Sequence, residues 1–137
     1  MKGETIEQQL ARHEGVKSKP YKDTVGKLTI GVGRNLDDVG LSMDEIYYLL
    51  RNDLNRVRTD IANNCPWFEN LSPERQKVIE NMVFNLGIVK FLQFKNTIRL
   101  ISEGKYDDVA KAMLDSRWAQ QVGKRATELS EMMRLGG

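Results

Sequence analysis

The sequence predicts an α+β fold that is mostly helical, with a small β-hairpin lobe and a larger helical lobe joined by a long helix. Three observations lead to this prediction. Strand-like alternation is convincing only between residues 20 and 33. One long helical period of apolar residues runs over about residues 42–63. The rest of the chain carries shorter helical periods that end at glycines.

Length and composition favour one domain over residues 1–137, long enough to bury a core without metal or disulfide staples. The single cysteine, Cys65, has no partner for an internal disulfide, and we expect a buried structural thiol. A net charge of +2 is too small to indicate nucleic-acid binding, whereas a mildly basic surface suits an anionic polymer.

The N-terminus lacks the apolar core of a signal peptide, because Ile6 and Leu10 are separated by polar residues. No later stretch approaches the roughly 20 apolar residues of a membrane span. We therefore expect a protein made in a cytoplasm, without membrane insertion.

The small lobe is predicted over about residues 14–41. Before it, Thr5 and Gln8 form a capping box that opens a short helix ending near Gly15. The β segment follows, with Val25-Gly26 as its turn.

The connecting helix is predicted from about 42 to 63, because Ser42 and Glu45 make a second capping box. At ~1.5 Å per residue it would be roughly 30 Å long. Its apolar positions recur at helical spacing: Ile46, Leu49, Leu50, Leu54, Val57 and Ile61.

The helical lobe is predicted over about residues 64–137, together with the first helix. Its most apolar helix begins with Ser72 as cap and Pro73 at the first position, and ends at Gly87, so we expect it at the centre of the core. Shorter helices are predicted at about 95–102, at about 107–115 after an Asp107 cap, and at about 123–135.

Two carboxylates are the candidate catalytic groups. Glu14 stands at the end of the first helix, whereas Asp23 and Thr29 stand on the hairpin, so the chain must turn back and could form a cleft. A carboxylate at the carboxyl end of a helix opposes the macrodipole, which favours a functional hypothesis for Glu14. Clefts with two unlike carboxylates often cut glycosidic bonds.

Metal and nucleotide sites are not expected. His13 adjoins Glu14, but a zinc-protease motif needs a second histidine and the chain has one. Gly31-Val32-Gly33 lacks the third glycine of a dinucleotide loop, and its glycines are expected to allow close backbone approach, for instance by a sugar ring. We predict no cofactor.

Asp53 lies in the apolar stripe of the long helix, where a charge needs a partner. Arg34 is the candidate, and the pair would tie the small lobe to the connecting helix. The alternative is that Asp53 lies in water at the edge of the stripe. Trp118 is assigned to packing.

Several short motifs occur in a fixed order along nearly the whole chain: Glu14-Gly15, Tyr21-Lys22-Asp23-Thr24 with Gly26, Thr29-Ile30-Gly31-Val32-Gly33, Asn81-Met82-Val83-Phe84-Asn85-Leu86-Gly87, Ser116-Arg117-Trp118 and Arg125. With these motifs the chain resembles the phage-type lysozymes, glycoside hydrolase family twenty-four. The resemblance implies a lysozyme-like two-lobe fold. It also implies a muramidase that hydrolyses, with inversion, the β-1,4 bond between N-acetylmuramic acid and N-acetylglucosamine of bacterial peptidoglycan.

The resemblance also implies roles for single residues. Glu14 falls on the general acid of the family, Asp23 on its second carboxylate, and Thr29 on a threonine that helps place water. Inversion needs the two carboxyl groups about 6.5–9.5 Å apart. Arg125 falls on an arginine that pairs with the catalytic glutamate. Four further residues fall on substrate-contacting positions: Asn35, Phe84, Asn85 and Thr97.

The chain departs from the family pattern in three places. Arg34 replaces a histidine, which would keep a contact with Asp53 and lose titration near neutral pH. The segment between Arg34 and Ser42 is much shorter, so the small lobe is trimmed. Ala112 stands where the family has a substrate-binding asparagine.

Two alternatives remain open at this point. One is a non-catalytic lysozyme-like module of a cell wall or a phage particle, and the other is a lytic transglycosylase, which releases an anhydro sugar. The expected partner in the main interpretation is bacterial peptidoglycan, the expected state is a monomer, and access to the wall would need a holin or lysis.

Overall fold

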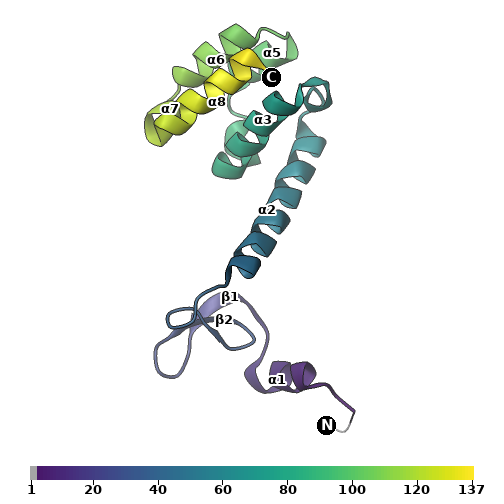
Figure 1. Ribbon diagram of the computed structural model, residues 1–137, viewed down its shortest axis with the longest axis vertical. Helices are drawn as coiled ribbons and strands as arrows, with labels where there is room; N and C mark the ends of the chain where they lie inside the picture. Colours follow the sequence, from purple (N-terminus) through teal and green to yellow (C-terminus); the bar gives the residue numbers. More distant parts are fainter. Residues whose placement is uncertain (1–2) are drawn as a thin grey trace. The chain divides into compact units, whose positions relative to one another are not determined.

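The computed structural model describes residues 3–137 and confirms a mostly helical α+β fold with a small antiparallel sheet. Contacts divide the chain into two compact units, a first unit through Leu49 and a second unit over Leu50–Gly137. The elements, labelled in Figure 1 where there is room, are α1 (Ile6–Glu14), β1 (Lys17–Lys22), β2 (Leu28–Gly31), β3 (Arg34–Asn35), α2 (Met43–Asn64), η1 (Phe68–Asn70), α3 (Pro73–Leu86), α4 (Ile88–Phe91), α5 (Lys95–Ser102), α6 (Tyr106–Leu114), α7 (Arg117–Val122) and α8 (Lys124–Leu135).

The first helix has the predicted boundaries. The Thr5 hydroxyl accepts a hydrogen bond from the backbone N–H of Gln8, and the Gln8 side chain accepts one from Thr5, which is a complete capping box. Gly15 ends the helix and donates to the carbonyl of Ala11. Glu14 is therefore the last residue of α1.

The sheet is larger than the hairpin predicted over residues 20–33. β1 begins at Lys17, and the two-residue strand β3 adds a third member in the order β1-β2-β3. Thr29 pairs with Tyr21 of β1 on one side and with Asn35 of β3 on the other. A strand of two residues is too short to show alternation, which is why the sequence does not predict it.

α2 begins where the second capping box predicts. The backbone N–H of Glu45 donates to the Ser42 hydroxyl at 3.2 Å, and the N–H of Ser42 donates to the Glu45 carboxylate at 2.8 Å. The helix starts in the first unit and continues into the second. Of its predicted apolar stripe, only Val57 and Ile61 are buried.

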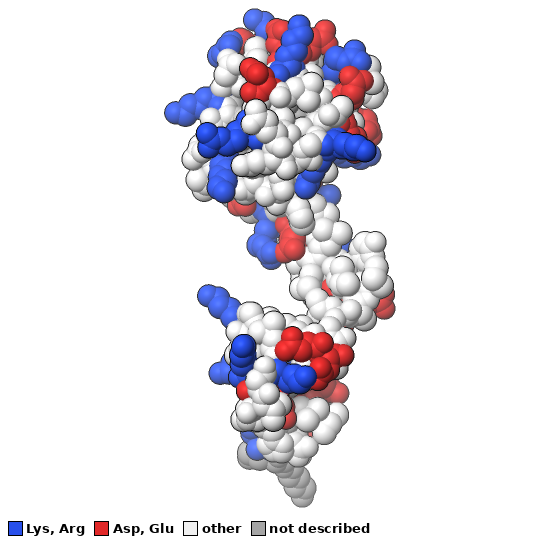
Figure 2. Space-filling view, turned by 90° about the vertical axis from the view of Figure 1, so that its left-hand side faces the viewer, with Lys and Arg blue, Asp and Glu red and all other residues white. Residues whose placement is uncertain are grey.

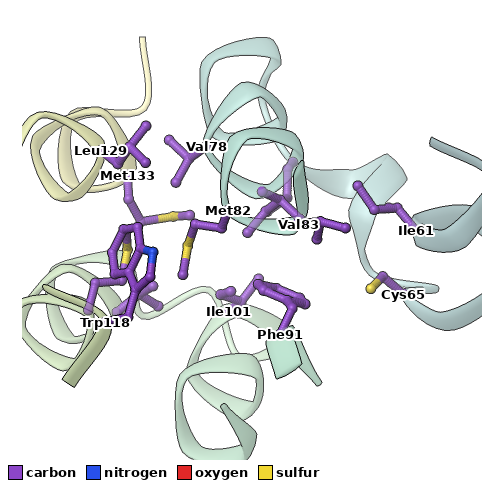
Figure 3. Close-up of a cluster of buried hydrophobic side chains, with 14 of the residues drawn as sticks. Ile61, Cys65, Val78, Met82, Val83, Phe91, Ile101, Trp118, Leu129 and Met133 are labelled. Carbon is purple, nitrogen blue, oxygen red and sulfur yellow. The ribbon is translucent and has the colours of Figure 1, made fainter. Parts of the chain in front are cut away.

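The hydrophobic core of the second unit is built around α3, as predicted. Ser72 caps this helix and Gly87 ends it. Figure 3 shows its side chains Val78 and Met82 beside residues of α8, with Trp118 of α7 in the same cluster. Trp118 is 3% exposed, which confirms its assignment to packing.

The remaining helices differ from expectation mainly in their starts. α5 and α8 agree with the predicted spans within a residue. α6 begins at Tyr106 without a side-chain cap, so the prediction of Asp107 as N-cap is wrong: that residue lies in the first turn. α4 and α7 were missed because they are four and six residues long, too short for a helical period.

Contacts group α1 with the sheet in the first unit, so its assignment to the helical lobe stays a prediction. Basic and acidic side chains are interspersed on the face drawn in Figure 2. Within residues 3–137, no helix combines the length and the apolar character required to cross a bilayer.

Candidate functional site

The Glu14 side chain lies close to Gly33. A Cβ atom added at Gly33 would stand 3.1 Å from Glu14 Oε2 and 3.4 Å from its Cδ and Cγ. Glu14 is the last residue of α1 and Gly33 belongs to the turn between β2 and β3, so the fold brings two separate segments together here. The sequence predicted that another group could come close to the backbone at these glycines. In the structure the group close to Gly33 is the side chain of Glu14, the catalytic candidate.

Gly33 meets two requirements at this point. Its φ is +66°, a region in which an L-residue with a Cβ is strained by about 1–2 kcal/mol. The missing side chain also leaves room for the Glu14 carboxylate. Glycine therefore suits the backbone conformation of this position, and a side chain here would require the Glu14 carboxylate to shift by a few tenths of an ångström.

Asp23 is held by the turn that follows it. Its Oδ1 accepts hydrogen bonds from the backbone N–H groups of Val25, at 3.0 Å, and Lys27, at 2.8 Å. Both bonds go to the same oxygen, so Oδ2 keeps its acceptor capacity for a ligand. The half-buried carboxylate thus has a set orientation before any substrate arrives.

Thr29 is connected to Asp23 through the backbone of Lys27. The Thr29 hydroxyl donates to the Lys27 carbonyl at 2.9 Å, and the same carbonyl accepts the N–H of Asp23. Thr29 is 3% exposed. Its proton is committed to the carbonyl, so only its lone pairs can serve a ligand. Sequence reasoning missed Lys27, although an aspartate that starts a glycine-containing turn predicts such backbone bonds.

Asn35 organises its own turn. Its side chain donates to the Asp38 carboxylate at 3.0 Å and accepts the N–H of Asp38 at 2.9 Å. Both ends of the amide are therefore engaged with one residue. Its predicted contact with substrate stays a prediction.

Arg34 pairs with Glu45, a partner that the sequence did not predict. The predicted pairing of Arg34 with Asp53 would join residues of the two units and stays a prediction. The Arg34 guanidinium forms a two-pronged contact with the Glu45 carboxylate, at 2.7 and 2.6 Å, and donates to the carbonyl of Gly40 at 3.1 Å. Asp53 pairs with Arg56, one turn along α2. The capping box places the Glu45 carboxylate beside the loop that follows β3.

The Arg34–Glu45 contact has an electrostatic consequence. The hydrogen bond from Arg34, reinforced by the backbone N–H of Ser42, lowers the pKa of Glu45 to about 2. Glu45 in turn raises the pKa of Arg34. Sequence reasoning used Glu45 only as a helix cap, and nothing in the spacing indicates its second partner.

In the second unit, Arg125 is bound to α3. Its Nε donates to the Asn81 side chain at 2.8 Å. Both residues line a cavity of about 370 Å³ whose apolar wall includes Leu54 and Leu129. The predicted pairing of Arg125 with Glu14 would join residues of the two units and stays a prediction.

The other predicted substrate contacts of the second unit have different environments. Asn85 accepts a hydrogen bond from the indole N–H of Trp118 at 2.9 Å, so it links α3 to α7. Phe84 is exposed on α3, whereas Thr97 is buried on α5. Ala112 packs against the core. Their contacts with substrate stay predictions.

Metal-binding side chains do not gather within residues 3–137, where no group of three or more His, Cys, Asp or Glu is suitably arranged. Cys65 is buried, as expected, and burial raises the pKa of its thiol. A raised pKa disfavours the reactive thiolate, so Cys65 has the properties of a packing residue.

Comparison with known proteins identifies the family to which this chain belongs. A profile described as phage lysozyme matches residues 11–133. Probable T4-type lysozyme 1 of Dictyostelium discoideum is 29% identical over an alignment that covers 96% of this chain and 95% of that protein. Probable T4-type lysozyme 2 of the same organism is 27% identical with the same coverage.

A third relative is a much longer protein. The pre-baseplate central spike protein Gp5 of Enterobacteria phage T4 is 26% identical over 96% of this chain, which corresponds to 28% of that protein. The profile match extends over most of the 137 residues and includes Glu14, Asp23 and Thr29. The chain belongs to the phage lysozyme family.

Proposed function

We propose that this protein is a muramidase that hydrolyses the β-1,4 bond between N-acetylmuramic acid and N-acetylglucosamine in bacterial peptidoglycan. One observation carries the proposal: the first unit holds two carboxylates in different environments. Glu14 is exposed and rests on Gly33, whereas Asp23 is half-buried and oriented by two backbone N–H groups. Most glycosidases use a pair of catalytic carboxylates that lie in different environments.

In the proposed reaction Glu14 is the general acid. Its protonated carboxyl gives a proton to the glycosidic oxygen while the bond from that oxygen to the anomeric carbon breaks. A water molecule attacks the opposite face of the sugar, and its oxygen forms the new bond to that carbon. Asp23 takes the proton that the water releases, so atoms and charge balance. The reaction inverts the anomeric centre.

The hydrogen bonds around Asp23 and Thr29 suit this assignment. Oδ2 of Asp23 can accept a proton because the backbone bonds occupy Oδ1. The Thr29 hydroxyl gives its own hydrogen to the Lys27 carbonyl, so it can accept one from water. A water held by both acceptors would direct a lone pair at the sugar, which is the role proposed for Thr29.

Product analysis on defined muropeptides tests the proposal. Hydrolysis adds one water to the products, whereas a lytic transglycosylase forms an anhydro sugar without adding water, and mass spectrometry separates the two. Proton NMR recorded immediately after cleavage reports the first anomer formed. An α product from the β bond supports inversion, and an initial β product would contradict it.

A second candidate function comes from the likeness to the central spike protein. In this interpretation the chain is a lysozyme-like module of a phage particle that does not cut the wall. Glu14, Asp23 and Thr29 are all present in the chain, and a pure scaffold needs none of them. Clearing of a suspension of purified bacterial walls would favour the muramidase, and unchanged turbidity would favour the scaffold.

We further propose that the protein acts as an endolysin. It would be made in a cytoplasm and reach the wall through a holin or after lysis, as a monomer and without binding nucleic acid or inserting into a membrane. Expression in bacteria with and without a holin, followed by culture density, tests delivery. Light scattering of the purified protein tests the monomer.

A further inference from the structure

The turn that supports Glu14 is tied to α2 by the residue that follows Gly33. Arg34 is the first residue of β3, and its guanidinium reaches Glu45 in the first turn of α2 with two bonds. The same guanidinium donates to the carbonyl of Gly40. One side chain therefore joins the sheet, the loop after it and the start of a helix.

The Glu45 end of this connection is itself held in place. Its Oε1 accepts the backbone N–H of Ser42 at 2.8 Å as well as the bond from Arg34. A two-pronged contact between arginine and carboxylate also sets direction, because the planar guanidinium fits the carboxylate in one orientation. We name the set of Arg34, Gly40 and Glu45 the Arg34 clamp.

The clamp lies one peptide bond from the contact with Glu14. A Cβ at Gly33 would be 3.1 Å from Glu14 Oε2, so a shift of this turn by a few tenths of an ångström moves the surface on which the carboxylate rests. A misplacement of about 1 Å can cost roughly 10²-fold in rate, so smaller shifts of a general acid are expected to have smaller effects in the same direction.

We propose that Arg34 and Glu45 are positioning residues for Glu14, acting through the backbone of Gly33. This inference rests on the proposed role of Glu14 as general acid. It assigns the clamp an effect on turnover, and not only on the stability of the first unit. An ion pair that merely stabilised the start of α2 would leave turnover unchanged at temperatures well below unfolding.

Glu45→Gln is the variant that best separates the contact with Arg34 from the helix cap. Glutamine at this position still completes the capping box with Ser42, so the helix start is kept while the charge and the second prong are lost. Arg34→Lys keeps the positive charge and removes the planar fork. Glu103→Gln is the matched control, because Arg99 contacts both oxygens of Glu103 at 2.8 and 2.9 Å in the second unit.

The kinetic test measures kcat and KM on soluble muropeptides. We expect kcat to fall about 10-fold in Glu45→Gln and in Arg34→Lys, with KM changed less than twofold, and both constants unchanged in Glu103→Gln. In a Glu14→Gln background, Glu45→Gln should cause no further loss, since the group that it positions is gone. Unchanged kcat in both clamp variants, with only a lower Tm, would overturn the proposal.

An NMR measurement tests the same proposal without relying on activity. The nuclear Overhauser effect between the Gly33 α-protons and the Glu14 γ-protons should be strong in the wild type and in Glu103→Gln, and weaker in Glu45→Gln. If the wild type does not hydrolyse muropeptides, the proposed function fails, and this effect still decides whether the clamp positions Glu14. An equally strong effect in Glu45→Gln would refute the positioning role.

Discussion

The carboxylate of Glu14 lies beside Gly33, with Oε2 3.1 Å from the place where a Cβ atom at residue 33 would stand. The two residues come from the end of α1 and from the β2–β3 turn. Neither a helix end nor a glycine is informative alone. Their contact gives an exposed carboxylate a defined surface to rest on, and it makes the glycine a testable part of the site.

Gly33→Ala should reduce turnover by about 10-fold to 10²-fold, because the new methyl group displaces the Glu14 carboxylate. Gly104→Ala is the matched control: its φ is +73° and an added Cβ meets nothing within 4 Å. Both variants should lose about 1–2 kcal/mol of stability from left-handed strain. Equal activity of the two variants in a wall-clearing assay would show that the contact with Glu14 has no catalytic importance.

Glu14→Gln should leave the fold intact and lower turnover by at least about 10²–10⁴-fold, the usual effect of losing one general acid. The amide keeps the size of the side chain and its place beside Gly33, but its N–H groups are not acidic enough to protonate the glycosidic oxygen. Circular dichroism and thermal unfolding check the fold, and muropeptide cleavage checks the rate. Wild-type activity in this variant would remove Glu14 from the mechanism.

Asp23→Asn and Asp23→Ala should separate the structural role of Asp23 in its turn from its role as a proton acceptor. Asparagine keeps an oxygen that can accept the N–H groups of Val25 and Lys27, whereas alanine cannot, so only alanine should cost about 1–3 kcal/mol of stability. Both should impair cleavage strongly because neither can take a proton. Asp23→Cys could retain more activity if the group chiefly supports water or charge, and equal loss in all three variants would contradict that idea.

Asn85→Ala should destabilise the second unit by about 1–3 kcal/mol, because the largely buried Trp118 loses its hydrogen-bond acceptor. Asn85→Asp keeps an acceptor and should be milder. Urea unfolding followed by tryptophan fluorescence measures the difference. A higher KM with unchanged stability would instead indicate that Asn85 acts mainly in substrate binding.

Thermal stability should depend on Glu45 in a predictable pH range. Its pKa in the folded protein is about 2, below the ordinary 4.5, so its contribution is complete above pH 4.5 and is lost as the pH falls towards 2. The difference in Tm between the wild type and Glu45→Gln should therefore be largest near neutral pH and shrink on acidification. A difference that stayed constant from pH 6 to pH 2 would contradict a contribution from the ionised Glu45 carboxylate.

Local patterns were sufficient for the helix boundaries. Thr5, Ser42 and Ser72 cap helices at the predicted places because a capping bond involves residues only two or three positions apart. Gly15 and Gly87 end helices for the same local reason. Elements shorter than two turns, such as α7, leave no period and were missed.

Partners between distant segments could not be predicted in this way. Spacing did not indicate Glu45 as a partner of Arg34, because the path of the chain after β3 brings the two residues together. The hydrogen bond from Trp118 to Asn85 likewise depends on how α3 and α7 pack.

The sequence by itself determined the fold class, the long helix and the core helix, and it made Glu14, Asp23 and Thr29 the catalytic candidates. Caps, helical periods and family motifs depend on residues that are close together in the chain. Only the tertiary structure decided what each of these residues touches: Gly33 behind Glu14, the backbone of Lys27 between Asp23 and Thr29, and Glu45 against Arg34. The physical reason is that a close contact depends on the path of the backbone through space, which residue spacing does not specify.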